Sequence, residues 1–164
     1  IGDSALDYFT KEEIENKKNS YADKGYIYPS KEYYAITFNN LAKFEKYQDV
    51  QFNFKDGDEN YKIYNLMGII NYPNNISDCY KELNSIENEF DRLFKNSEKQ
   101  DRYEYNHKAD KTGKSKTESF SYKISSKDYI TVSCADWSEE MDIMDALRIE
   151  IRLKIFNDFI KKFY

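Results

Sequence analysis

The chain has 164 residues, a net charge of −5 and an isoelectric point near 5.1. This length is enough for one domain with a buried core, and 16 Tyr with 11 Phe argue against disorder. The acidic total disfavours general nucleic-acid binding, because such binding needs a basic face, and no apolar run approaches the ~20 residues that a transmembrane segment needs.

The first 20 residues are predicted to form two short helices in succession. Asp3 or Ser4 can cap a turn that ends near Phe9. Thr10 and Glu13 then form a capping box, in which the hydroxyl accepts from the third backbone N–H and the carboxylate reaches back. The apolar face of these helices would consist of Leu6, Phe9 and Ile14.

Three strands are expected next, because apolar residues alternate with smaller or polar ones. A turn over 56–59 would join the second and third of them as a hairpin. Gly68 in the third run indicates a bulge or a close-packing point. The alternating residues are Tyr34, Ile36 and Phe38, then Val50, Phe52 and Phe54, and then Tyr61 and Ile63 in a run that reaches Tyr72.

The clearest helix begins in the segment 74–78, which starts at Asn74. Apolar residues at helical spacing form one stripe, and the opposite face is Lys, Glu and Asn, so this helix should pack on one side and face water on the other. The stripe consists of Ile76, Cys79, Tyr80, Leu83, Ile86, Phe90, Leu93 and Phe94.

Strands resume after residue 100, and the strictest alternation lies near the end of the chain, where one face is apolar and the other charged. This pattern predicts a half-buried antiparallel strand, followed by a short terminal helix with Phe156, Phe159, Ile160 and Phe163. The earlier strands are marked by Tyr103, Tyr105 and His107, by Phe120, Tyr122 and Ile124, and by Ile130, Val132 and Cys134. The last has Leu147, Ile149, Ile151, Leu153 and Ile155 on one face, and Arg148, Glu150, Arg152 and Lys154 on the other.

The order of elements predicts the α+β class: an antiparallel sheet with helices packed on one face. We expect a single domain over 1–164, with possible halves 1–73 and 74–164. The order also suggests a tandem helix-plus-three-strand repeat, with three or four strands in the second half, as in the β-lactamase-inhibitor-protein-like fold. That comparison concerns element order and says little about function.

Two cysteines point toward one core by independent arguments. Cys79 lies on the apolar stripe of the long helix, and Cys134 lies on the inward face of a strand. In an exported chain this favours a disulfide, which would stabilise by about 4 kcal/mol in the chain-entropy model; the alternative is two buried free thiols. Two Cys and one His far apart do not make a zinc site, and we expect neither a metal nor a cofactor.

The segment TGKS resembles the end of a phosphate-binding loop. Such a loop needs an earlier glycine, at the position that Lys108 occupies, and a helix directly afterwards, whereas 117–124 alternates like a strand. We therefore expect 108–116 to be an exposed connection between antiparallel strands. Its lysines and donors could serve as an anion or partner loop, although a solvated hairpin tip is the simpler interpretation: Lys108, Lys111, Thr112, Gly113, Lys114, Ser115 and Lys116.

His107 is the only histidine, and Trp137 is the only tryptophan. A histidine-dependent hydrolase would need a nucleophile and an orienting acid; Asp110 could be the acid, but no serine is distinguished. The neighbouring lysines should lower the pKa of His107 by like-charge repulsion. Trp137 could be a binding platform, and a core anchor at a strand end is the preferred interpretation.

Four stretches together resemble a group of small exported proteins of unknown function from AT-rich marine α-proteobacteria of the Pelagibacter type. The stretches are IGDSALDYFTKEEI, NYPNNISDCYKEL, DKTGKSK and VSCADWSEE, in this order along most of the chain. The resemblance implies a periplasmic or cell-surface location and carries over no catalytic residue. The start at Ile1 agrees with a signal peptide that has been removed.

The sequence thus favours an exported, non-enzymatic binding or interaction module. It would hold a partner protein or a small anionic ligand on a sheet face or on the hairpin loop, without nucleic acid and without a transmembrane segment. A self-assembling cell-surface subunit is the first alternative, because tyrosine-rich sheets can pair at their edges. A small hydrolase using His107 is the second.

Overall fold

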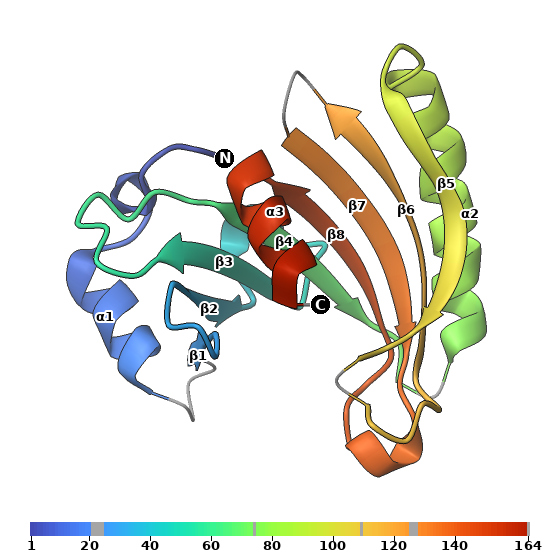
Figure 1. The fold of residues 1–164 in the computed structure, drawn as a ribbon, viewed down its shortest axis with the longest axis horizontal. Coiled ribbons are helices and arrows are strands. Elements are labelled where there is room, and N and C mark those ends of the chain that lie inside the picture. Colours follow the sequence, from blue (N-terminus) through green and yellow to red (C-terminus); the bar gives the residue numbers. More distant parts are fainter. Residues whose placement is uncertain (21–24, 74, 109, 125–127, 164) are drawn as a thin grey trace.

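A computed structural model describes residues 1–20, 25–73, 75–108, 110–124 and 128–163. Figure 1 shows one curved sheet with helices on both sides. The strands are β1 (Gly25–Ile27), β2 (Tyr33–Asn39), β3 (Asp49–Lys55), β4 (Asn65–Asn71), β5 (Glu98–Asn106), β6 (Lys116–Ile124), β7 (Asp128–Asp136) and β8 (Ala146–Arg152). The helices are α1 (Lys11–Asn19), α2 (Ile76–Leu93) and α3 (Lys154–Phe163), with 3-10 turns η1 (Ala5–Asp7), η2 (Ala42–Phe44) and η3 (Glu139–Met141).

All eight strands form one antiparallel sheet in the order β1-β2-β3-β4-β8-β7-β6-β5. The predicted α+β class is therefore confirmed. Each run of strands is a meander, and the two meanders meet where β4 pairs with β8. Four strands follow α1 instead of the expected three, because the short strand β1 adds to the edge of β2.

The register shows which side chains share a face of the sheet. Phe52 pairs with Leu66, and Leu66 pairs with Ile151, so these three side chains point to the same side. Ile14 of α1 packs in the cluster that contains Phe52, and α2 packs on the cluster that Ile151 joins. Both helices consequently cover the same face.

The expectation that the helices pack on one face of the sheet is wrong for α3. Tyr33 alternates with Tyr34, which lies on the α1 side, so Tyr33 points to the opposite side. Phe156 and Phe159 of α3 pack against Tyr33. Figure 1 shows α3 on the inner side of the curved sheet and α2 along its outer side.

The core under α2 contains the predicted disulfide. Cys79 and Cys134 are bonded, with their Cα atoms 6.0 Å apart, and both are fully buried. The predicted stripe of the helix holds, except that Leu93 is 64% exposed because it lies at the last turn of the helix. Asn74, where the helix was expected to begin, lies outside the described residues.

The N-terminal helices form as predicted. Thr10 and Glu13 make both hydrogen bonds of the capping box, and Ser4 caps η1. Ile14 is fully buried, whereas Leu6 is 43% exposed. Leu6 was wrongly placed on the apolar face, because η1 is a single 3-10 turn and does not continue the helical spacing of α1.

Gly68 is a close-packing point, and no bulge is present at its position in the register. The ring of Tyr47 lies directly on its Cα: a Cβ at this position would be 2.5 Å from ring atoms. Only glycine leaves room for the aromatic ring against the strand.

The last strand is shorter than its alternating sequence pattern predicts. β8 ends at Arg152, and α3 begins at Lys154, so Ile155 lies on a helix and is 54% exposed. The terminal helix itself was predicted; the side chain of Phe163 lies outside the described residues. The charged face of β8 is also not a solvated face, because Glu150 is only 9% exposed.

Candidate functional site

The loop between β5 and β6 is a connection between antiparallel strands, as expected. His107 closes it by donating its backbone N–H to the Ser115 carbonyl at 2.9 Å. Gly113 has φ +73°, and the chain continues directly into strand β6. Because no helix begins there, the segment lacks the helix N-terminus of a phosphate-binding loop.

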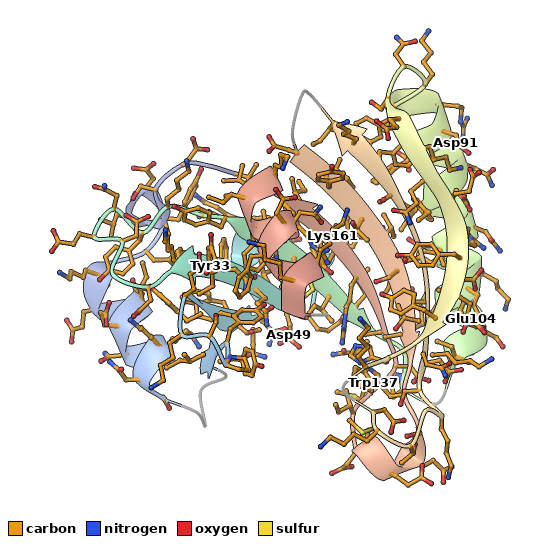
Figure 2. All side chains as sticks on the ribbon, viewed as in Figure 1. Tyr33, Asp49, Asp91, Glu104, Trp137 and Lys161 are labelled. Atoms are coloured by element: carbon orange, nitrogen blue, oxygen red, sulfur yellow. A yellow bond between two sulfur atoms is a disulfide. The ribbon has the colours of Figure 1, made fainter. Side chains whose placement is uncertain are left out.

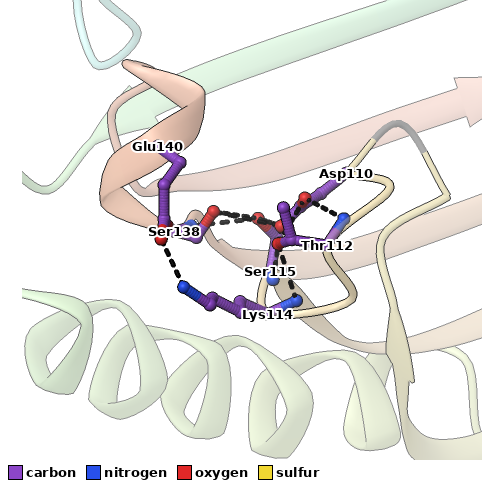
Figure 3. Close-up of polar contacts among 6 residues, drawn as sticks. All are labelled: Asp110, Thr112, Lys114, Ser115, Ser138 and Glu140. Carbon is purple, nitrogen blue, oxygen red and sulfur yellow. Dashed lines mark hydrogen bonds and ion pairs between the residues drawn. The ribbon is translucent and has the colours of Figure 1, made fainter.

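Asp110 is a buried carboxylate that organises this loop (Figure 3). Thr112 and Ser115 each donate a backbone N–H and a hydroxyl to it, at 2.7–2.9 Å. Ser138, which precedes η3, donates its hydroxyl at 3.0 Å. The bonds from Ser115 and then Thr112 hold the pKa of Asp110 far below its usual value, and they fasten the loop to the β7–β8 connection.

The donors that were expected to face an anion therefore face Asp110. Among the lysines of the loop, Lys114 pairs with Glu140 and Lys116 pairs with Glu104. Lys108 and Lys111 are exposed. The use of this loop as an anion or partner site stays a prediction. The donors of Thr112 and Ser115 do not favour it, because they already bond to Asp110.

A second group of side chains lies on the α3 side of the sheet, beyond the end that α3 covers. We call this group the open face: Tyr103, Tyr105, His107, Trp137 and Arg148. The rings of Tyr103 and Tyr105 stack with centroids 5.3 Å apart and are 45% and 40% exposed. Trp137 lies at the end of β7 (Figure 2).

The register explains why these side chains meet. Arg148 of β8 pairs laterally with Ser133 of β7, and Ser133 pairs with Ser119 of β6. Both serines are small and almost fully buried, so they form a floor across which larger side chains can lie. Burial is the first cause of the raised pKa of Tyr105; Tyr103 and then Glu150 raise it further, whereas Arg152 and Arg148 act in the opposite direction.

Trp137 contacts two side chains on this face. The His107 ring lies 4.1 Å from it, centroid to centroid, and the Arg148 guanidinium carbon lies 5.6 Å from its ring. The backbone N–H of Trp137 donates to Asp145 at 2.8 Å, which fixes the position of the residue. Trp137 is partly buried and belongs to none of the three core clusters of described residues, so its role as a core anchor stays a prediction.

Arg148 and Arg152 have opposite environments, although both are on β8. Arg152 pairs with Glu150 through two nitrogens, at 2.6 and 2.8 Å. Arg148 makes no hydrogen bond or ion pair within the described part of the chain, and its Nε is buried. Burial lowers the pKa of Arg148. Glu150 acts on the charge of Arg148 from the same strand, but it does not supply the hydrogen-bond acceptor that the buried Nε lacks.

Two further buried donors near Arg148 are unpartnered. They are the indole Nε1 of Trp137 and the hydroxyl of Thr117, which pairs laterally with Tyr105. Buried polar groups in folded proteins are nearly always hydrogen-bonded. Three polar atoms without a hydrogen-bond partner among the described residues therefore lie on the open face.

The pKa of His107 is lowered, as predicted, but for a different reason. Burial is the main cause, and the charge of Arg148 is the second; Asp110 acts in the opposite direction. Like-charge repulsion thus comes from an arginine on a distant strand instead of the neighbouring lysines, because the lysines extend into solvent.

Arg148 was missed by the sequence reasoning, which placed it on a solvated face. One signal was present: the chain has 4 Arg against 21 Lys, and two of the four arginines are on one strand. Arginine has a planar, weakly hydrated guanidinium that suits buried recognition of carboxylates. Its presence in a lysine-rich chain is consistent with positions where the planar guanidinium is needed.

Comparison with known proteins gives no relative: no family model, no curated protein and no solved structure matches the chain. Two properties of the described residues bear on the predicted partners. No helix among them has the length and apolar character to cross a membrane. No group of three or more His, Cys, Asp or Glu among them is arranged to hold a metal ion.

Proposed function

We propose that the protein is a non-enzymatic binding module that holds a carboxylate, from a small ligand or from a partner protein, on the open face. The observation that carries this proposal is Arg148, which is partly exposed on this face and whose buried Nε has no hydrogen-bond acceptor among the described residues. A carboxylate can accept two parallel hydrogen bonds from such a group.

The surroundings of Arg148 support the same interpretation. Tyr103 and Tyr105 present exposed, stacked rings beside it, and tyrosine, tryptophan and arginine are the residues that dominate binding energy at interfaces. The protein is acidic overall, so an arginine that makes no ion pair among the described residues is a specific feature against that background.

The hydrolase alternative is less well supported. Asp110, the acid that His107 would need, accepts hydrogen bonds from Ser115, Thr112 and Ser138. Ser115 is fully buried, so its hydroxyl has no path to a substrate. Catalysis by a nucleophile and a base requires access as well as reach.

The self-assembly alternative rests on the exposed edge strand β5. Its register is interrupted between Gln100 and Tyr103, and its solvent-exposed residues include Glu98 and Glu104. Irregular, charged edges work against pairing with another strand. For these reasons we favour recognition by side chains on the face over pairing at the edge.

We further propose that the protein works outside the reducing cytoplasm, at the periplasm or cell surface. The buried Cys79–Cys134 bond supports this location, because such bonds persist in oxidising compartments. We also propose that α1 with β1–β4 and α2 with β5–β8 are copies of one unit, in the β-lactamase-inhibitor-protein-like order. The mirror-like strand order, in which the last strands of both units pair, supports the duplication.

Binding can be tested with phenylacetate, which carries a ring for the tyrosines and a carboxylate for Arg148, and with the neutral match phenylacetamide. Calorimetric titration should give saturable binding of phenylacetate and at least about tenfold weaker binding of phenylacetamide. Arg148→Met should remove the difference between the two. Arg92→Met, at an exposed arginine on α2, is the control and should leave it unchanged. Equal affinities of the wild-type protein for both compounds would contradict the proposal.

A further inference from the structure

A second concave site lies on the other face of the sheet, between the N-terminal segment and η2. Its cavity volume is about 340 Å³, in the range of pockets for small molecules. Its apolar lining includes Phe9, Leu41, Phe44, Phe52, Ile63 and Leu66.

These apolar lining residues all pack in the core that Ile14 of α1 joins. Phe52 and Leu66, which pair laterally, form the floor. Phe9 forms one wall, where its ring stacks on Phe38 at 4.2 Å and meets Phe52 edge-on at 5.3 Å. Leu41 and Phe44, next to and within η2, form the opposite wall. An apolar molecule that occupies this space removes these side chains from water, which favours binding.

The rim of the cavity carries a cation. Lys43 lies with its ammonium 5.3 Å from the centre of the Tyr8 ring, so it links η2 to the N-terminal segment across the opening. Within the described residues Lys43 has no ion-pair partner. Asp3 also lines the cavity, but its side chain is 68% exposed and pairs with the amino group of Ile1 at 3.7 Å.

We propose that this cavity binds a free, medium-chain monocarboxylate, with its alkyl chain among Phe9, Phe44 and Leu66 and its carboxylate at Lys43. The apolar lining selects a hydrocarbon body, and the single rim lysine selects one negative head group. The site is independent of Arg148, which lies on the opposite face of the sheet.

The test uses octanoate and its uncharged match 1-octanol, titrated into the protein by calorimetry. Wild-type protein should bind both, octanoate about tenfold more tightly. Lys43→Gln should weaken octanoate binding about tenfold and leave 1-octanol unchanged. Lys111→Gln, at an exposed lysine in the β5–β6 loop, is the charge control and should change neither.

Two more measurements locate the ligand. Leu41→Trp, which fills the cavity, should abolish binding of both compounds. In wild-type protein, octanoate should shift the NMR methyl signals of Leu41, Ile63 and Leu66 but not those of Leu83 and Leu147 in the core under α2. These methyl shifts locate the ligand even if the Leu41→Trp variant fails to fold. Absence of octanoate binding, shifts confined to the α2 core, or an unchanged affinity in Lys43→Gln would each overturn the proposal.

Discussion

Two neighbouring regions of the molecule differ in how they satisfy a charged side chain. In the β5–β6 loop, Asp110 accepts five hydrogen bonds from three residues. On the open face, Arg148 makes none within the described residues. A charge that the chain satisfies itself holds the fold together, whereas a charge that it leaves unsatisfied is available to a ligand. The difference separates a structural group from a candidate binding group.

The largest effect is expected at Asp110. Asp110→Ala leaves the donors of Thr112, Ser115 and Ser138 without an acceptor, so the thermal midpoint should fall by roughly 10–15 °C. Asp101→Ala, at an exposed position on β5, is the matched control and should change it little. Circular dichroism melting measures both. An unchanged midpoint in Asp110→Ala would show that the hydrogen bonds do not hold the loop.

Replacing each of the two arginines of β8 by methionine should change the free energy of unfolding differently. Arg152→Met leaves the buried Glu150 carboxylate unpaired and should cost about 3 kcal/mol of unfolding free energy. Arg148→Met removes a charge that makes no hydrogen bond or ion pair among the described residues, and should leave stability unchanged or raise it by about 1 kcal/mol. Urea unfolding compares the two variants. Equal destabilisation by both would mean that Arg148 is a structural residue.

Stability at acid pH should depend on Asp110. Its pKa is lowered in the folded state, so its contribution is present above the unfolded pKa of about 4 and is lost as pH falls through the folded value. The difference in thermal midpoint between wild type and Asp110→Asn should be constant from pH 7 to about pH 5 and narrow below pH 4. A difference in thermal midpoint that widens toward low pH would contradict the lowered pKa of Asp110.

The smallest effect concerns His107, whose signals in an NMR titration are unambiguous because it is the only histidine. Its pKa is lowered by burial and by Arg148. In Arg148→Met the pKa should rise by less than about one unit and stay below the usual 6.5, since burial remains. The same pKa in both proteins would show that the guanidinium does not act on the imidazole.

Sequence patterns predicted the features that depend on neighbouring residues or on one face of one element. The Thr10–Glu13 capping box and the apolar stripe of α2 are local in this sense, and the shared core of Cys79 and Cys134 follows from two such faces. The alternation in β8 correctly divided its residues between two faces. It could not show what covers the charged face, because that depends on the neighbouring side chains of β5 and on the position of α3.

The candidate site was predicted only in part for the same reason. His107 and Trp137 were recognised as unusual residues, but not as a stacked pair, because 30 positions separate them along the chain. Arg148 reaches them only through the lateral register of β6, β7 and β8. Registers between strands far apart in sequence depend on the whole sheet, which a single sequence does not specify.

The most direct test of the central claim is the NMR signal of the Trp137 indole N–H during titration with phenylacetate. Trp137 is the only tryptophan, its Nε1 is buried without an acceptor, and its ring contacts Arg148. We predict a saturable shift of this signal in wild-type protein, with the same dissociation constant as calorimetry gives, and no shift in Arg148→Met. A signal that stays fixed while phenylacetate binds, or that shifts equally in Arg148→Met, would contradict the account.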